Sequence, residues 1–156
     1  MATVKPFQAL RPYKGIEQCF SCPPYDVLEE DEIREIISRN PNSFLRVTRS
    51  EVEVEEDSKE AIYKKAKENL ESFIKNGVLI KDAEPSFYIY RETWQEVSQT
   101  GFFAVVSVDE YDRGIIKKHE LTRRDKENDR TNHILNLNAQ TGPVFLTYKA
   151  LSLIHI

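Results

Sequence analysis

The sequence predicts an α+β fold, in which helices pack on a mixed or antiparallel sheet. Helix-like and strand-like patterns alternate along the chain, but they do not repeat as the strand–helix–strand units of a parallel sheet. The chain has 156 residues, of which 40% are hydrophobic. This length and composition suffice for one hydrophobic core and are not those of a disordered tail.

The charge and the apolar runs argue against two classes of partner. The formal net charge is −4, whereas nucleic-acid binding relies on clustered Lys and Arg. The longest apolar run, Phe102 to Val106, is too short to cross a bilayer. The first residues lack the basic start and apolar stretch of a signal peptide. We therefore expect a cytoplasmic protein without a nucleic-acid or membrane partner.

Two segments have the periodicity of amphipathic helices. The first runs from Glu30 to Arg39 and ends at Asn40-Pro41. The second follows Ser58, a suitable N-cap, and ends at Asn76-Gly77. The apolar residues at helical spacing are Ile33, Ile36 and Ile37 in the first and Ile62, Ala66, Leu70, Phe73 and Ile74 in the second. A third, more polar helix is expected from Asp125 to Leu137.

The strand predictions depend on shorter patterns. The start of the chain predicts an extended segment that ends in a turn at Lys14-Gly15. The apolar residues of 44–47 predict a short buried strand, and the acidic residues 51–57 predict an exposed connection. Residues 87–90 and 101–108, connected through 95–100, predict an antiparallel hairpin. Two further short strands are expected, at 115–116 and at 144–146.

The common catalytic and phosphate-binding motifs are absent from the sequence. The five glycines do not form a dinucleotide-binding or P-loop signature. His119-Glu120 begins like a zinc-protease motif, but Arg123 stands where the second histidine is required. Cys19 and Cys22 lack a second ligand pair for zinc and are followed directly by two prolines, so two reduced thiols are expected.

The first candidate site is the segment Pro23-Pro24-Tyr25-Asp26. Two prolines fix the backbone, so this segment can direct a phenol and a carboxylate into a cleft with little loss of entropy. Asp26 is therefore a candidate general base, and Tyr25 a candidate substrate-binding residue. The alternative is that Asp26 caps a turn and Tyr25 packs against the protein.

The second candidate site lies just before the third predicted helix. His119 and Glu120 are candidate acid–base residues there. The candidate substrate- or phosphate-binding residues are Thr122, Arg124, Lys126 and Arg130, because cations near a helix start favour anions. The alternative is a solvated helix start with charge pairs along its surface. Arg46 and Arg11 are further candidates for binding phosphate or carboxylate; the alternative is that each pairs with an acidic neighbour on the surface.

Several segments together resemble the amino-terminal portion of the bacterial and archaeal family called domain of unknown function 1015. The resemblance extends, in order, from about Val4 to Tyr148. The segments that carry it are Lys5-Pro6-Phe7, Ala9-Leu10-Arg11-Pro12, Pro23-Pro24-Tyr25-Asp26-Val27, Asn40-Pro41-Asn42-Ser43-Phe44-Leu45-Arg46-Val47, Tyr88-Ile89-Tyr90-Arg91, Lys118-His119-Glu120-Leu121-Thr122, Asp125-Lys126, Asp129-Arg130 and Thr141-Gly142-Pro143-Val144-Phe145-Leu146-Thr147-Tyr148.

The resemblance implies a nucleotide-dependent phosphotransferase that acts on a small molecule such as free serine. Family members are longer, so the resemblance implies that this chain is an incomplete part of a larger domain. They carry an Asp-Gly-His-His-Arg motif, which is similar to an element of the ParB/sulfiredoxin-like fold. ATP or ADP with Mg²⁺ is the cofactor that this similarity implies. The motif is absent from this chain, so the active site would be incomplete and the fragment would be inactive.

The last residues, 151–156, do not continue the family pattern. One back-translation of Leu151 to Ile156 resembles the end of a common sequencing adapter, so we expect residues 1–150 to be the native part. A chance hydrophobic tail is the alternative.

Two functions follow from these patterns. In a phosphotransferase, Asp26 or Glu120 would take the proton of a substrate hydroxyl. The residues that would neutralise phosphate charge are His119, Arg124, Lys126 and Arg130. In the alternative, the same basic segment belongs to a non-catalytic or regulatory module that binds an anionic metabolite.

Overall fold

The computed structural model describes residues 2–56, 58–118 and 122–148. The expected non-native tail at 151–156 and the candidate residues His119 and Glu120 lie outside these ranges. None of the helices in the described ranges has the length and hydrophobicity needed to span a membrane. Six α-helices, one short 3-10 helix and small antiparallel sheets make up this part of the chain, which is therefore an α+β fold.

Helix α2 (Glu30–Arg39) has the predicted bounds. Its start is fixed by a reciprocal capping box, in which Glu29 and Glu32 each accept a hydrogen bond from the other's backbone N–H. On its buried face, Ile33 packs with Leu45 and Val52 in a small hydrophobic cluster. The apolar spacing of this segment therefore located both the helix and its inner face.

The expected strand at 44–47 is wrong, because this segment forms helix α3 (Leu45–Thr48). Phe44 and Val47 are three residues apart and pack on one cluster, while Leu45 packs on the other. That arrangement requires helical spacing, and a run this short does not distinguish a helix from a strand. The expected exposed connection is wrong at its start, where the 3-10 helix η1 (Ser50–Glu53) buries Val52.

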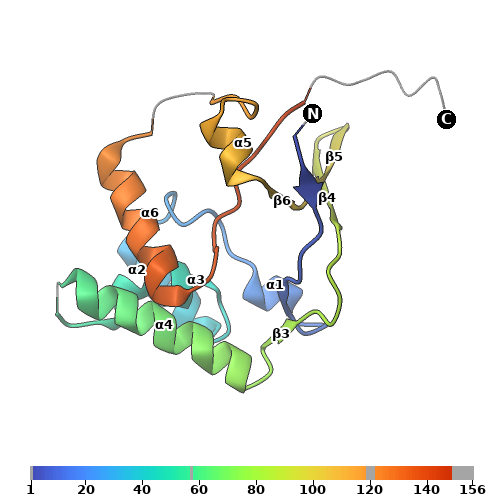
Figure 1. Ribbon diagram of the computed structural model, residues 1–156. Helices are drawn as coiled ribbons and strands as arrows, with labels where there is room; N and C mark the ends of the chain where they lie inside the picture. The colour runs from blue at the N-terminus through green and yellow to red at the C-terminus, as the bar shows by residue number, and fades with distance from the viewer. Residues whose placement is uncertain (1, 57, 119–121, 149–156) are drawn as a thin grey trace.

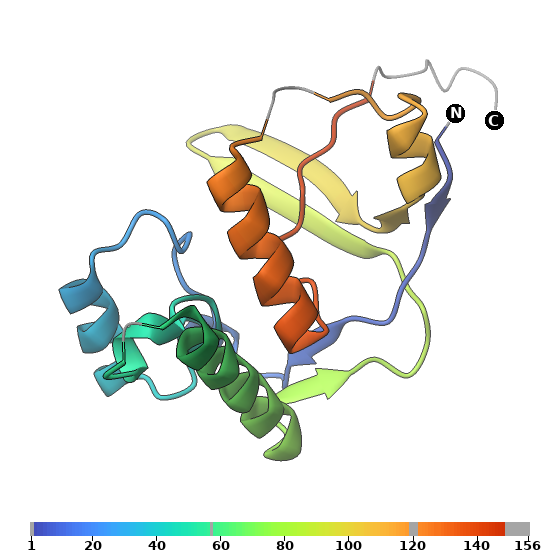
Figure 2. The same ribbon diagram turned by 60° about the vertical axis from the view of Figure 1, so that its left-hand side comes forward.

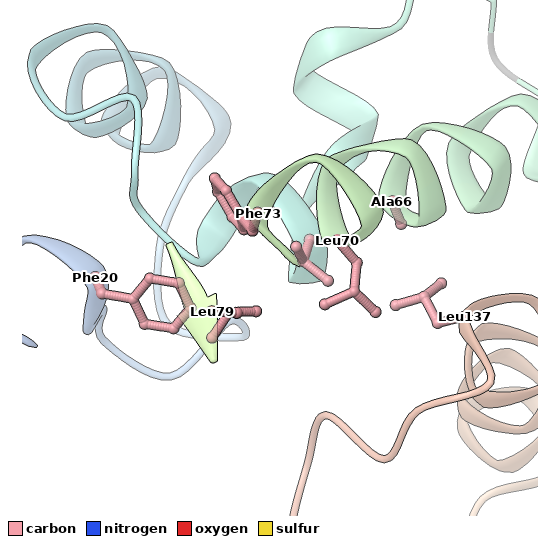
Figure 3. Close-up of a cluster of buried hydrophobic side chains, with 7 residues drawn as sticks. Phe20, Ala66, Leu70, Phe73, Leu79 and Leu137 are labelled. Carbon is pink, nitrogen blue, oxygen red and sulfur yellow. The ribbon is translucent and has the colours of Figure 1, made fainter. Parts of the chain in front are cut away.

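Helix α4 (Lys59–Lys75) forms the base of the main core. The Ser58 hydroxyl accepts a hydrogen bond from the Ala61 N–H at 3.1 Å, which confirms the predicted N-cap. Gly77 ends the helix region with a φ of +71°, as a glycine tolerates well. Figure 3 shows Leu70 of α4 facing Leu137, the last residue of α6 (Arg124–Leu137). The full cluster consists of Phe20, Val47, Ala66, Leu70, Phe73, Leu79 and Leu137.

The N-terminal part of the chain pairs with distant segments. Strand β1 (Val4–Lys5) pairs with β6 (Val105–Val106), and β2 (Leu10–Pro12) pairs with β3 (Leu79–Lys81), both antiparallel. The expected turn follows β2 at Lys14-Gly15. The short helix α1 (Glu17–Phe20) then carries Phe20 into the main core. Cys19 in this helix and Cys22 after it are both free thiols.

The predicted hairpin is present, with different bounds. Strand β4 (Tyr88–Trp94) pairs antiparallel with β5 (Val97–Phe103), so the turn lies at Gln95-Glu96, and the expected long connection at 95–100 is wrong. The expected strands at 115–116 and 144–146 are also wrong. The amides of Ile115 and Ile116 bond to the carbonyl of Glu110 in helix α5 (Val108–Asp112). Residues 144–146 have no ladder partner among the described strands.

The elements gather in two regions. Helices α2, α3, α4 and α6 lie on one side of the molecule, while β1, β6 and the hairpin lie on the other (Figure 1). The turned view in Figure 2 shows the hairpin extended behind α6. The helices α4 and α6 contact each other, and α3 packs on α4. This helical side positions the candidate site.

Candidate anion-binding pocket

A pocket of about 440 Å³ opens on the helical side of the molecule. One wall is the loop at 25–28, and the opposite wall is α6. The segment that connects α3 to η1 and the first turns of α4 complete it. A volume of this size accommodates a small metabolite. A second cavity, of about 190 Å³, lies between the hairpin and residues 145–148, and Glu92 is its one charged residue.

The loop wall is stiff at its start and supported from below. Pro23-Pro24 fixes the backbone, and the Val27 N–H donates to the carbonyl of Pro24 at 3.3 Å. The Arg49 guanidinium donates to the carbonyls of Tyr25 and Leu28, at 2.5 and 2.9 Å. Tyr25 and Asp26 are both exposed on this loop.

The α6 wall is one face of the helix. Lys126, Asp129, Arg130 and His133 all line the pocket, and their spacing of three, four and seven residues places them on the same side of α6. The Arg130 guanidinium lies over the Tyr25 ring, 4.8 Å from its centroid, and thereby joins the two walls.

Asp129 orients Arg130. Its carboxylate accepts hydrogen bonds from Arg130 Nε at 3.0 Å and from the Tyr63 hydroxyl at 2.9 Å. Partial burial raises the pKa of Asp129, but the hydrogen bonds from Arg130 and Tyr63 outweigh burial and hold this pKa below its usual value. Burial, followed by the bond to Asp129, raises the pKa of the Tyr63 phenol. Asp129 is therefore ionised and Tyr63 protonated near neutral pH.

His133 of α6 also lines the pocket and is only 3% exposed. Its Nε2 lies 3.0 Å from the carbonyl of Val47, which can only accept, so Nε2 carries the proton. The other ring nitrogen faces the Thr141 hydroxyl at 3.4 Å. Burial lowers the pKa of this imidazole. His133 is thus a neutral residue that joins α6 to α3 and does not supply charge to the pocket.

The charged side chains of the pocket leave an excess of positive charge. Four cations line it, namely Arg49, Lys59, Lys126 and Arg130, against the three carboxylates of Asp26, Glu51 and Asp129. Arg49 pairs with Glu51, and Arg130 with Asp129. Neither lysine forms an ion pair with a carboxylate in the described ranges. The unpaired charge in the pocket is therefore mainly lysine ammonium.

The described pocket residues do not form a binding site for a divalent cation. No group of three Asp, Glu, His or Cys side chains is placed to hold a metal within the described part of the chain. Glu51 and Asp129 are engaged by arginine, which leaves Asp26 as the one carboxylate outside an arginine pair among the described lining residues. We therefore assign no residue to Mg²⁺.

Four of the predicted site residues share this pocket. Tyr25 and Asp26 come from the first candidate segment, and Lys126 and Arg130 come from the second. Residues 25–26 and 126–130 are about a hundred positions apart in the chain. The arrangement thus joins two segments that the sequence analysis treated separately.

The other predicted site residues lie elsewhere. Thr122 and Arg124 are exposed and do not line the pocket. Arg46, expected on a strand, belongs to α3 and pairs with Glu53, with their nitrogen and oxygen atoms 2.9 Å apart. Arg11 pairs with Asp82 on β3's side of the molecule, at 2.7 Å.

Sequence reasoning missed five of the lining residues that give the pocket its shape. Two had a signal: Asp129 and His133 are three and seven residues after Lys126, so they share its helix face. The other three had none, because Arg49, Lys59 and Tyr63 reach the pocket only through the packing of α3 on α4 and of α4 against α6.

A comparison with known protein families identifies the family of this chain. A family model described as "Protein of unknown function (DUF1015)" matches residues 4–155. The chain belongs to this DUF1015 family. No curated protein and no solved structure matches it, so the relation to the ParB/sulfiredoxin-like fold remains a prediction.

Proposed function

We propose that this DUF1015 chain binds a small phosphate-bearing metabolite in the pocket between the 25–28 loop and α6. The observation that carries the proposal is the convergence of Lys126 and Arg130 from one face of α6 with Lys59 from α4. Cations that come from separate elements surround an anion and bind it with charge-assisted hydrogen bonds. Arg130 contributes even though it is paired, because its planar guanidinium has more donors than Asp129 uses.

Phosphate fits the excess of cationic donors better than an uncharged ligand does. A neutral ligand would leave the pocket's positive charge uncompensated. A phosphate or diphosphate group bound by the lysines supplies that negative charge, with the rest of the metabolite against Tyr25.

The binding proposal is tested by isothermal titration with inorganic pyrophosphate as the probe. We expect Lys126→Gln and Arg130→Gln each to raise Kd by about tenfold, the equivalent of about 1.4 kcal/mol. Arg124→Gln is the matched control, because it removes the same charge from the same helix outside the pocket. An equal loss in all three variants would mean that net charge alone attracts the anion and would refute a specific site.

A second candidate function is phosphoryl transfer from a nucleotide to the hydroxyl of a small molecule such as serine. It is supported by Asp26, whose carboxylate lies in the same pocket as the cations, and by the family resemblance. In this reaction the substrate hydroxyl oxygen attacks the terminal phosphorus, the bond to the departing ADP oxygen breaks, and Asp26 accepts the hydroxyl proton. Lys126 and Arg130 hold the phosphate oxygens during the transfer.

Asp26→Asn separates the two functions. If transfer occurs, this variant loses turnover of ATP with serine by about a hundredfold or more while its affinity for pyrophosphate stays within about twofold of the wild type. The measurement is ADP release in the intact protein. Absence of turnover in the intact wild-type protein would leave metabolite binding as the function and reject the transferase.

A further inference from the structure

Arg49 differs from the other cations of the pocket in what it contacts. One of its Nη atoms donates to two backbone carbonyls, those of Tyr25 and Leu28, at 2.5 and 2.9 Å. Its Nε donates to the Glu51 carboxylate. The side chain is 18% exposed. The guanidinium thus faces protein acceptors on both of its sides, and its charge is balanced by Glu51.

The two carbonyls belong to the ends of the loop that forms one wall of the pocket. A guanidinium bridging the first and the last residue of a four-residue loop limits the backbone freedom of the residues between them. Pro23-Pro24, directly before Tyr25, also restricts the backbone where the loop begins. Tyr25 and Asp26 are therefore held in place by backbone contacts, although their side chains are exposed.

We infer that Arg49 is a positioning residue, which holds the 25–28 loop in the shape that faces α6 and on which ligand affinity depends. This inference rests on the proposed function for its binding part, but its structural part stands separately. A ligand anion does not need to touch Arg49. A preformed wall lowers the entropy that binding would otherwise cost, and the affinity follows from that.

Arg46 provides a matched control within the same helix region. It also has a half-buried guanidinium that pairs with a glutamate, Glu53, and donates to a backbone carbonyl, that of Pro41, at 3.2 Å. It does not line the pocket and does not touch the 25–28 loop. A change at Arg46 therefore reproduces the general cost of disturbing a structural arginine without altering the loop.

The substitution Arg49→Lys tests positioning against charge. Lysine keeps the positive charge, but its single ammonium lacks the planar fork that reaches two carbonyls and a carboxylate at once. We measure two quantities for Arg49→Lys and Arg46→Lys: backbone ¹⁵N order parameters of residues 26–28 in the ligand-free protein, and Kd for inorganic pyrophosphate. A near-wild-type amide spectrum outside the loop establishes that each variant is folded, and Arg49→Gln repeats the test if the lysine variant is not.

The expected result is specific to Arg49. The order parameters at 26–28 fall from about 0.85 toward about 0.6, and Kd rises by about fivefold, an effect of about 1 kcal/mol, while Arg46→Lys changes neither. An ordered loop in Arg49→Lys, or a loosened loop with unchanged Kd, overturns the inference. If the wild-type protein does not bind pyrophosphate, the proposed function fails and the binding part of the inference fails with it. The order parameters then decide the structural part alone.

Discussion

The helical region (α2, α3, α4 and α6) buries hydrophobic residues that the β4–β5 hairpin leaves exposed. In the helical region, Ile33, Leu45 and Val47 are fully buried. In the hairpin, Ile89 and Trp94 are each 75% exposed, although both strands are fully paired with each other. The helices are thus stabilised by side-chain packing, and the hairpin by its backbone ladder and by aromatic pairs such as Tyr90 with Phe103.

This difference explains where the pocket lies. A binding site needs walls that stay in place, and the helical region supplies them because its elements share two hydrophobic clusters. His133 and Tyr63 are buried below the pocket and connect its walls to that core. The hairpin has exposed apolar side chains, and none of its residues belongs to either hydrophobic cluster of the described part of the chain.

The largest expected effect on stability comes from shortening one aliphatic side chain in each region to alanine. Leu70→Ala should lower the free energy of unfolding by about 2–5 kcal/mol, because it leaves a cavity between α4 and α6. Ile89→Ala in the hairpin should change it by less than about 0.5 kcal/mol, since this side chain is mostly exposed. Urea unfolding measures both values. Equal losses would show that the hairpin packs against a core of its own.

The next effect concerns polar contacts in the two regions. Asn69 is buried and donates to the carbonyl of Arg46 at 2.7 Å and to the Glu53 carboxylate at 2.6 Å. Asn69→Ala should cost about 2 kcal/mol, because it removes the donor to the partly buried Arg46 carbonyl and one of the donors to Glu53. The hairpin counterpart is Thr93→Ala, which removes an exposed hydroxyl pair with Ser98 and should cost less than about 0.5 kcal/mol. The same urea titration checks both. If Thr93→Ala lowered the free energy of unfolding as much as Asn69→Ala, the two regions would not differ as described.

Acid should weaken the helical region through His133. Its folded-state pKa lies below the ordinary value of 6.5 because of burial. Above that pH the imidazole is neutral in both states and has no effect. As the pH falls below it, the imidazole binds a proton in the unfolded chain but not in the folded one. The free energy of unfolding therefore decreases by at most about 1.4 kcal/mol per pH unit. The decrease stops below the folded-state pKa.

The variant His133→Gln isolates this contribution. The difference in unfolding free energy between the variant and the wild type should change with pH between about 6.5 and the folded-state pKa and should be constant above. A difference that is independent of pH would mean that the imidazole is accessible to protons in the folded protein.

The smallest expected effects come from replacing two serine N-caps with alanine. Ser58→Ala should destabilise α4 by about 1 kcal/mol, because its hydroxyl accepts the Ala61 N–H at 3.1 Å. Ser107→Ala, at the start of the short helix α5, should cost less, since the corresponding distance to the Glu110 N–H is 3.4 Å. Thermal unfolding compares the two variants, and the reverse order would contradict the stronger coupling of α4 to the core.

The same contrast governs how much could be predicted from the sequence. Helices α2 and α4 were located because a buried stripe at helical spacing produces a periodic apolar pattern. The segment at 44–47 was assigned wrongly because its residues pack on two clusters at once, which a four-residue pattern cannot reveal. The hairpin bounds differ from the prediction because the first residues of β5 are all exposed, and three of them, Ser98, Gln99 and Thr100, are polar, so they show no apolar alternation.

The site was predictable only in part for the same reason. Tyr25, Asp26, Lys126 and Arg130 stand out because prolines and clustered charges mark their segments. Their meeting in one pocket depends on α6 packing against α4, a long-range contact with no local signature. Arg49 was missed because a residue that bonds to backbone carbonyls leaves no pattern in the sequence of its acceptors.

The most direct test of the account is a pyrophosphate titration followed by amide ¹H–¹⁵N shifts across the chain. We predict saturable shifts at residues 25–28 and along α6 from Lys126 to His133, with the amides of β4 and β5 unchanged. Saturable shifts confined to the hairpin, or no saturable shifts at all, would contradict a pocket that is built by the helical region and binds phosphate.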